Sequence, residues 1–396
     1  APSATQRGVD IPEMISRSVV ALRRLGGAGR CQLGVRAMAT QASSLTYEKR
    51  GSPITLNVTS AAVPAPSAAQ VQVKFLASSV SYSDFSPISA SHDGATSLPV
   101  KDTSVRFAKA KAIGPIDPIA GPLGKPPKTP AVGGLEGVAV VEAVGSSVKG
   151  LAPGDWVLPS AGVGSWQTHA VVDEAKVVKV RNDIPPEYAA CLSVSASAAL
   201  RLLEDFEKLS AGDVIIHNCA NGMVGQVLIQ LAAARGIKVI SVLRAKATLE
   251  DLSDHLKSIG STAVVPEPQL RSHYMQELLA DLPAPKIAFD GVGGASGSLI
   301  ARVMPKGGRM VSFGGASGEP LLLPAELGTK VEGFYLSQWL EKNGTAARQK
   351  MVDTLADSVA EGKIKLLLER GSFAKHRVSL NKAFEVMRDR RLVMMF

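Results

Sequence analysis

The run VIIHNCANGMVGQ, residues 214–226, is the most informative local sequence of this chain. Its start, Val214–Asn218, is rich in β-branched apolar residues and predicts a buried strand, and a helical pattern begins at Val224. In the turn between them we expect Gly222 to take a backbone angle that other residues disfavour, and Gly225 to let the helix pack closely on the strand. This order of elements predicts open N–H groups where a pyrophosphate can bind.

The chain around this run alternates between strand and helix patterns. A helical stretch, Ala189–Leu209, comes first. Strands are predicted at 214–218, 238–242, 263–265, 287–290, 309–313 and 331–335, with helices at 224–235 and 252–259 between them. Six apolar strands with intervening helices predict an α/β fold, a doubly wound parallel sheet of the Rossmann type.

The end of the second strand indicates which dinucleotide is bound. An NAD enzyme usually carries an acidic residue there for the ribose hydroxyls. This chain has Leu243-Arg244-Ala245-Lys246 instead, with no acid before Glu250. Two cations favour an additional 2′-phosphate, so NADP(H) is predicted; the alternative for Arg244 is a solvated surface charge.

The first half of the chain has a different pattern. From about Ser44 it carries short β-rich segments separated by glycine and proline, at 71–76, 138–144, 156–158 and 169–180. These predict a small twisted β-barrel. A proline-rich loop from Ala90 to Pro130 interrupts it, and a loop of that length is usually functional or disordered.

Composition and charge narrow the class of protein. The 396 residues are 45% hydrophobic and 20% charged, and no apolar run is long enough for a membrane span. The net charge of +9 is concentrated in residues 14–47, which contain no acid, and in residues 101–130. Neither stretch interleaves aromatic with basic residues, so we expect no nucleic-acid partner.

The N-terminal residues resemble a targeting segment. Residues 14–45 are rich in arginine, serine and alanine, and Ile15–Leu25 fits a short amphipathic helix, which is typical of a mitochondrial presequence. If this arm is retained, it needs a surface to lie against. A protein partner and the body of the same chain are both open as that surface.

Cysteine usage disfavours a disulfide framework and a structural zinc lobe. The three cysteines are Cys31, Cys191 and Cys219, and none forms a CxxC pair. A reducing compartment is therefore expected.

Several runs make a family resemblance specific. They are Pro130–Gly134 with Glu136-Gly137, Val144–Ser146, Pro153–Val157, Leu203–Phe206, Val224–Gln226, Gly291–Gly294 and Gly333–Trp339. In this order the chain resembles mitochondrial trans-2-enoyl-CoA (enoyl-thioester) reductases, a zinc-free, quinone oxidoreductase-like branch of the medium-chain dehydrogenase/reductase superfamily. Zinc-dependent relatives have a histidine where this chain has Leu135, so no metal is expected.

The resemblance implies a division into domains. Residues 1–43 would be the targeting-like arm. Residues 44–195, with the insertion 90–130, would form a GroES-like substrate domain that residues 341–396 complete. Residues 196–340 would form the Rossmann NADP-binding domain.

The resemblance also implies cofactor-binding positions. Ser195 stands where the family has an asparagine that contacts the cofactor, and Arg390 stands near a late family lysine. The remaining positions are Asn221, Gly222, Met223, Val224, Gly225, Arg244, Lys246, Phe313, Gly314, Gly315, Phe334, Tyr335 and Leu336.

The catalytic positions depart from the family pattern. The family tyrosine that assists protonation and holds the thioester oxygen aligns with His92, which could donate a proton or could be an ordinary loop histidine. Tyr82 could supply a hydroxyl from a shifted position, although a role in packing is the alternative. The family's Asn-Pro-Ser-Asp and Asn-Pro runs are Ser81–Asp84 and Ser195-Ala196 here.

These departures predict a protein whose chemistry is impaired. The main expectation is an NADPH-binding, reductase-like accessory subunit of a larger mitochondrial assembly, such as a respiratory complex, in the matrix. The N-terminal arm and the 90–130 insertion would contact its protein partners. The alternative is an active NADPH-dependent enoyl-thioester reductase of mitochondrial fatty-acid synthesis, with an acyl thioester as substrate. A quinone reductase shares the fold but fits the Ser337–Trp339 run less well.

Overall fold

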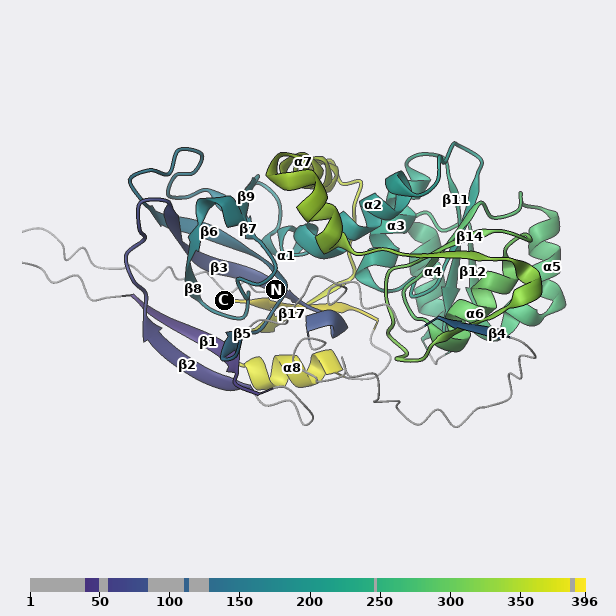
Figure 1. Cartoon of the computed structure of the whole chain (residues 1–396), viewed down its shortest axis with the longest axis horizontal. Helices are drawn as coiled ribbons and strands as arrows, with labels where there is room; N and C mark the ends of the chain where they lie inside the picture. Colours follow the sequence, from purple (N-terminus) through teal and green to yellow (C-terminus); the bar gives the residue numbers. More distant parts are fainter. Residues whose placement is uncertain (1–39, 50–55, 85–109, 114–127, 246–247, 385–388) are drawn as a thin grey trace, which may run out of the picture. The chain divides into compact units, whose positions relative to one another are not determined.

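A computed structural model describes residues 40–49, 56–84, 110–113, 128–245, 248–384 and 389–396 (Figure 1). Residues 39–396 form one compact unit. Most of the predicted N-terminal arm and most of the 90–130 insertion therefore lie outside the described residues. Within the described ranges, none of the helices combines the length and apolar character that a membrane crossing requires.

Short antiparallel strands form the first part of this unit (Figure 1). One sheet has the order β2-β1-β5, from β2 (Asn57–Ala62), β1 (Gln41–Tyr47) and β5 (Ala131–Val132). The larger sheet has the order β17-β18-β3-β6-β7-β9, and β8 also pairs with β3. Its strands are β3 (Gln70–Val80), β6 (Glu136–Val144), β7 (Trp156–Pro159), β8 (His169–Asp173), β9 (Val177–Val180), β17 (Leu368–Ser372) and β18 (Arg391–Met395). Their alternating apolar residues build a core around Val71, Val73 and Phe75.

The C-terminal strands complete this barrel. β18 pairs antiparallel with β3, so that Leu392 lies opposite Val80 and Met395 opposite Ala77. β17 pairs parallel with β18 on the other side. Helix α8 (His376–Phe384) joins the two strands, and Leu380 contributes to their core. The chain thus leaves the barrel after β9 and returns to it at β17.

A six-stranded parallel sheet forms the second part, in the order β12-β11-β10-β13-β14-β16. The strands are β10 (Val214–His217), β11 (Lys238–Leu243), β12 (Ala263–Pro266), β13 (Ile287–Asp290), β14 (Arg309–Ser312) and β16 (Lys330–Gly333). The order reverses between β10 and β13, the point at which doubly wound sheets bind their ligands. The predicted α/β Rossmann fold is confirmed.

Helices cover both faces of this sheet (Figure 1). Along β10, Ile215 belongs to the core that also contains residues of α2 and α3, whereas Val214 and Ile216 belong to the core on the opposite face, with residues of α5 and α6. Because both faces are buried, the strands are continuous apolar runs. The helices are α2 (Ser197–Asp205), α3 (Met223–Ala233), α4 (Leu249–Ser258), α5 (His273–Ala280) and α6 (Gly294–Val303).

The predicted helix Ala189–Leu209 is three elements. They are α1 (Pro186–Ala189), the π-helix η4 (Leu192–Ala196) and α2. The amide of Ala196 bonds to the carbonyl of Cys191, five residues earlier. The predicted helical stretch is therefore present, divided into separate elements, and it ends at Asp205.

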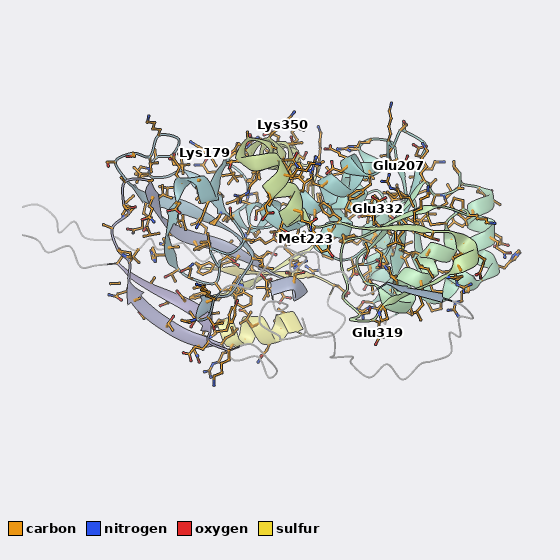
Figure 2. All side chains as sticks on the ribbon, viewed as in Figure 1. Lys179, Glu207, Met223, Glu319, Glu332 and Lys350 are labelled. Atoms are coloured by element: carbon orange, nitrogen blue, oxygen red, sulfur yellow. The ribbon has the colours of Figure 1, made fainter. Side chains whose placement is uncertain are left out.

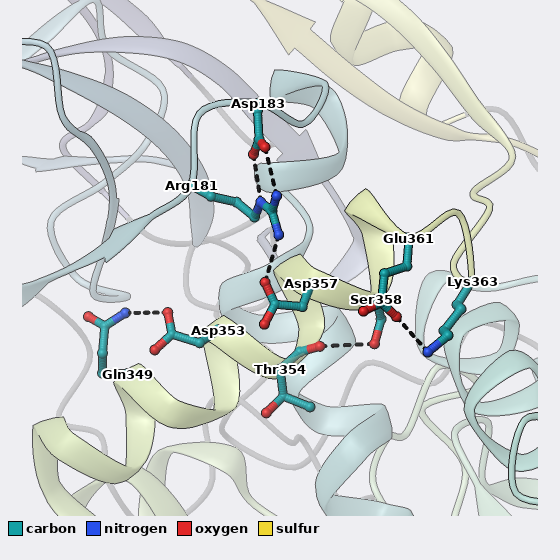
Figure 3. Close-up of polar contacts among 9 residues, drawn as sticks. All are labelled: Arg181, Asp183, Gln349, Asp353, Thr354, Asp357, Ser358, Glu361 and Lys363. Carbon is teal, nitrogen blue, oxygen red and sulfur yellow. Dashed lines mark hydrogen bonds and ion pairs between the residues drawn. The ribbon is translucent and has the colours of Figure 1, made fainter.

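The long helix α7 (Leu336–Ala360) connects the two parts of the unit, with a kink at Gly344, where φ is 73°. Arg348 is 7% exposed and donates hydrogen bonds to the carbonyl of Leu158, at 3.0 Å, and to Ser160 Oγ, at 2.7 Å. Nearer the helix end, Arg181 bonds to Asp183 and to Asp357 of α7 (Figure 3). These contacts hold the second half of α7 against the barrel strands β7 and β9.

One described piece of the insertion reaches the second part. β4 (Ala110–Ile113) pairs antiparallel with β15 (Leu321–Pro324), so that Ile113 lies opposite Leu321. β15 packs on α6, where Ser298 Oγ accepts a hydrogen bond from the amide of Leu322 at 3.0 Å. The predicted structureless loop from Ala90 to Pro130 therefore includes a strand.

Candidate functional site

The loop between β10 and α3 is the centre of the candidate site. Gly222 caps α3 with φ −69° and ψ 163°, an ordinary extended conformation. The unusual angle lies instead at Cys219, with φ 56°. The prediction of a special backbone angle at Gly222 was wrong, because the left-handed turn occurs three residues earlier.

Gly225 is required by a close approach of the backbone. A Cβ atom there would lie 2.6 Å from the carbonyl oxygen of Ala220 and 2.7 Å from that of Cys219. The glycine therefore lets the first turn of α3 sit directly on the loop, rather than on the strand as predicted. The start of α3 is at Met223 (Figure 2). Among the described residues, no side chain caps this end of α3 with a hydrogen bond, so its first-turn amides can receive an anion.

A buried network fixes the neighbouring strand ends. Asn218 Nδ2 donates to Asp290 Oδ1 at 2.7 Å, and Asn218 Oδ1 accepts from the amide of Gly291 at 2.7 Å. Asp290 Oδ1 also accepts from the amide of Gly293 at 2.9 Å, and Ser312 donates to Oδ2 at 3.2 Å. Burial raises the pKa of Asp290, and these donors oppose that rise. The network holds the carboxyl ends of β10, β13 and β14 in one arrangement.

The loops after β13 and β14 lie in direct contact. A Cβ at Gly314 would be 2.6 Å from the carbonyl oxygen of Gly291, so only glycine fits there. The amide of Phe313 bonds to the carbonyl of Asp290 at 2.8 Å, and the Phe313 side chain is 8% exposed. Phe313, Gly314 and Gly315, which the family resemblance implies as cofactor-binding positions, thus follow β14 beside the switch point.

Basic side chains lie near the loop. Arg244 is exposed just after β11. Burial raises the pKa of the Cys219 thiol, and the positive charges of Arg391 and Arg244 act in the opposite direction. Burial of His255 on α4 lowers its pKa, and the positive charge of Arg390 lowers it further.

Ser195 makes contact with a barrel carboxylate. Its hydroxyl donates to Glu136 Oε1 at 2.6 Å, and its amide donates to Glu136 Oε2 at 3.0 Å. Ser195 is 6% exposed and Glu136 is 3% exposed. A cofactor contact by Ser195 stays a prediction; in the structure the residue joins β6 to η4.

A second carboxylate, Asp84, is also buried, and it is close enough to Glu136 for the charge of Glu136 to affect its pKa. Asp84 accepts hydrogen bonds from the amide of Leu135, at 2.7 Å, and from the Ser81 hydroxyl, at 2.8 Å. Burial raises the pKa of Asp84 to about 6, with a smaller contribution from the charge of Glu136, while the Ser81 and Leu135 hydrogen bonds lower it. Asp84 therefore holds its proton to a higher pH than an exposed aspartate does.

The predicted cofactor-binding residues Phe334, Tyr335 and Leu336 lie in a mostly packed part of the chain. Phe334 is 5% exposed and meets Phe206 edge to face, with ring centroids 5.7 Å apart. Leu336 is 6% exposed, and Tyr335 stands at the N-cap of α7. The backbone of this run is thus positioned firmly, and its contact with a cofactor stays a prediction.

Three predicted residues cannot be placed. His92 and Lys246 lie outside the described residues. The backbone of Tyr82 begins the 3-10 helix η1 (Tyr82–Asp84), and its side chain is outside the description. No group of three histidine, cysteine, aspartate or glutamate side chains in the described part of the chain is placed to hold a metal ion.

The sequence prediction missed the buried polar residues that support the candidate site. Asn218 and Asp290 each stand at the carboxyl end of a predicted parallel strand. Polar residues at such positions meet at one edge of the sheet, so this signal was present in the sequence. Asp84 and Glu136 were noted only as parts of motifs. Their closeness depends on long-range packing, which leaves no local signal.

Comparison with known proteins then gives the family. A family model, the alcohol dehydrogenase GroES-like domain, matches residues 67–182. The human mitochondrial enoyl-[acyl-carrier-protein] reductase is 42% identical over 275 residues, which span 67% of this chain and 73% of the human protein. The chain belongs to the mitochondrial enoyl-[acyl-carrier-protein] reductase family.

Further matches agree with this enoyl reductase family. The Dictyostelium discoideum mitochondrial enoyl-[acyl-carrier-protein] reductase is 38% identical over 305 residues, covering 74% of this chain and 86% of that protein. A solved structure described as the Etr1p/NADP/crotonyl-CoA complex has a TM-score of 0.74 at 25% identity, covering 90% of this chain and all of the other. The resemblance and the barrel-plus-Rossmann fold predicted from the sequence are confirmed.

These relatives change the weight of the functional predictions. The enoyl reductases are named as mitochondrial enzymes. They favour the alternative prediction, an active enoyl-thioester reductase, over the main prediction of an impaired accessory subunit of a respiratory assembly. No match supports the accessory role.

Proposed function

We propose that this protein is an active NADPH-dependent reductase of 2-enoyl thioesters in the mitochondrial matrix. The observation that carries the proposal is the loop of residues 218–225 within a chain 42% identical to a mitochondrial enoyl-[acyl-carrier-protein] reductase. Loop geometry alone would fit any dinucleotide enzyme, and family membership narrows the substrate to an enoyl thioester.

The residues of the site fit the cofactor. The first turn of α3, from Gly222 to Gly225, would hold the pyrophosphate, because no side chain among the described residues caps its amides and Gly225 lets this turn sit directly on the loop. Arg244 and Lys246 would bind the 2′-phosphate through charge-assisted hydrogen bonds. The loop Phe313–Gly315, the run Phe334–Leu336, and residues Ser195 and Arg390 would line the rest of the nucleotide.

The reaction needs two contributions from the chain. When bound, NADPH supplies the hydride that forms the new bond at the β-carbon of the enoyl thioester. The protein must then deliver a proton to the α-carbon and stabilise charge on the thioester oxygen. We assign the donor to His92, with Tyr82 as the second candidate. The products are the saturated acyl thioester and NADP⁺.

Turnover of the purified full-length chain tests this proposal. We expect loss of NADPH absorbance on addition of crotonyl-CoA, at a rate that falls strongly in the His92→Ala variant if His92 is the donor, or in Tyr82→Phe if Tyr82 is. NADPH binding without turnover would overturn the enzymatic proposal and restore the accessory reading. Failure to bind either nicotinamide coenzyme would overturn both.

Protein partners are a separate proposal. The sequence predicts that the N-terminal arm and residues 90–130 contact other chains in mitochondria. Cross-linking of the protein in mitochondrial extracts, followed by mass spectrometry, tests it: links from these two stretches to other proteins support the proposal, and links confined to this chain contradict it.

A further inference from the structure

Gln226 makes two hydrogen bonds that reach in opposite directions from α3. Its Nε2 donates to the carbonyl oxygen of Asn221, in the loop between β10 and α3, at 2.8 Å. Its Oε1 accepts from the amide of Leu367 at 3.0 Å. Because one partner is an acceptor and the other a donor, the orientation of the amide is fixed by the network. The side chain is 1% exposed, and both bonds are part-buried because their backbone partners are partly exposed.

Gln230 stands one turn later on α3 and holds the same segment. Its Nε2 donates to the carbonyl of Lys365 at 2.8 Å, and its Oε1 accepts from the amide of Lys365 at 2.6 Å. It is 7% exposed. The two glutamines thus clamp residues 365–367, which lead from α7 back to the barrel strand β17. In the part of the chain that the structure describes, Gln226 is the one of the two that also bonds to the loop between β10 and α3.

The bond to Asn221 fixes one peptide at the mouth of the phosphate site. The carbonyl of Asn221 is held by Gln226, and the amide of the next residue, Gly222, bonds to the carbonyl of Cys219 at 2.9 Å. Hydrogen bonds therefore fix both the carbonyl and the amide of this peptide. The amides of the residues that follow belong to the first turn of α3. A rotated peptide would turn a carbonyl oxygen, the negative end of its dipole, towards the phosphates.

We infer that Gln226 is a positioning residue for the nicotinamide cofactor, and that it couples the phosphate loop to the segment that returns the chain to the barrel. The inference rests on the proposed function, because it assumes that NADPH binds at this loop. Gln230 shares the helix, the burial and the clamped segment, and has no bond to the loop. It is therefore the matched control.

The experiment compares Gln226→Met with Gln230→Met in the full chain. Methionine has nearly the shape of glutamine, so the core stays filled while the amide is lost. Thermal unfolding of both variants checks that each is folded. The dissociation constants for NADPH and NADH are then measured by fluorescence titration, and KM for crotonyl-CoA is measured at saturating NADPH.

We expect Gln226→Met to weaken NADPH binding about tenfold, since it leaves the part-buried carbonyl of Asn221 without its donor beside the phosphates. NADH binding should weaken by the same factor, because the contact lies at the pyrophosphate rather than at the 2′-phosphate. KM for crotonyl-CoA should stay within about twofold. Gln230→Met should lower the unfolding temperature while NADPH affinity stays within about twofold of the wild type.

Equal loss of NADPH affinity in the two variants would overturn the inference, because docking of residues 365–367 alone would then explain it. Unchanged NADPH affinity in Gln226→Met would overturn it as well. If the wild-type protein binds no NADPH, the proposed function fails instead, so the two failures are distinguishable.

Discussion

The hydroxyl of Ser195 donates a hydrogen bond of 2.6 Å to Glu136 Oε1, which joins the π-helix η4 to the barrel strand β6. The other oxygen of Glu136 accepts from the amides of Val194, at 3.1 Å, and Ser195, at 3.0 Å. A buried barrel carboxylate is therefore satisfied by the first residues of the nucleotide-binding half. This contact fixes the junction between the chain's two parts.

Ser195→Ala should destabilise the protein by about 1.5–3 kcal/mol, because it removes a buried hydrogen bond to a charged group. Ser193→Ala is the control. The hydroxyl of Ser193 is also buried and has no hydrogen-bond partner among the described residues, so its loss should leave stability unchanged or slightly higher. Urea unfolding of both variants measures the difference, and equal effects would contradict the special role of the Ser195 bond.

Asp84 should make stability depend on pH. Its folded pKa of about 6 lies above the ordinary 3.8, so between these values the folded protein holds more protons than the unfolded chain. The contribution of Asp84 therefore becomes less favourable as pH rises from about 4 to 6, by about 3 kcal/mol for a shift of about two units. Subtracting the stability profile of Asp84→Asn from that of the wild type isolates this slope; a flat difference would show that Asp84 ionises normally.

Gly225→Ala should weaken NADPH binding at least about tenfold, since the new methyl group would collide with two backbone carbonyls and displace the loop. Gly222→Ala should have a smaller effect. A Cβ at Gly222 would lie 3.0 Å from its nearest neighbour, and the backbone angle there suits any residue. Titration of both variants with NADPH tests the order, and a greater loss at Gly222 would refute it.

Arg244→Ala should lower affinity for NADPH about tenfold and leave affinity for NADH nearly unchanged, because only NADPH carries the 2′-phosphate. Arg235→Ala removes the same charge just beyond the other end of α3, where Arg235 bonds to Glu204 at 2.7 Å, and should change neither affinity. A parallel loss for both coenzymes in Arg244→Ala would place this guanidinium elsewhere on the nucleotide.

The sequence predicted the parallel sheet well. The bounds predicted for the strand Ile287–Asp290 match β13. The other five strands were found with ends shifted by a few residues at most. Strands buried on both faces are uninterrupted apolar runs, so their local composition identifies them.

Features that depend on distant contacts could not be predicted. The helical stretch from Ala189 begins again at η4, where Glu136, more than fifty residues away along the chain, accepts hydrogen bonds from the first-turn amides of Val194 and Ser195. β15 was missed because its partner β4 lies about two hundred residues earlier. The backbone angle of Gly222 was predicted wrongly. The local sequence shows that a glycine is present, whereas the folded loop decides whether the backbone angle or the small size of that glycine is needed.

The pairing of β18 with β3 has a consequence for biosynthesis. All strands of the Rossmann sheet lie between residues 214 and 333, whereas the barrel needs Leu392–Met395 beside Ala77–Val80. During synthesis on the ribosome, the parallel sheet of residues 214–333 can fold before β18, the last strand of the barrel, has been made. The edge of β3 that β18 will cover is then exposed throughout translation, and a chaperone that shields it would raise the yield of native protein.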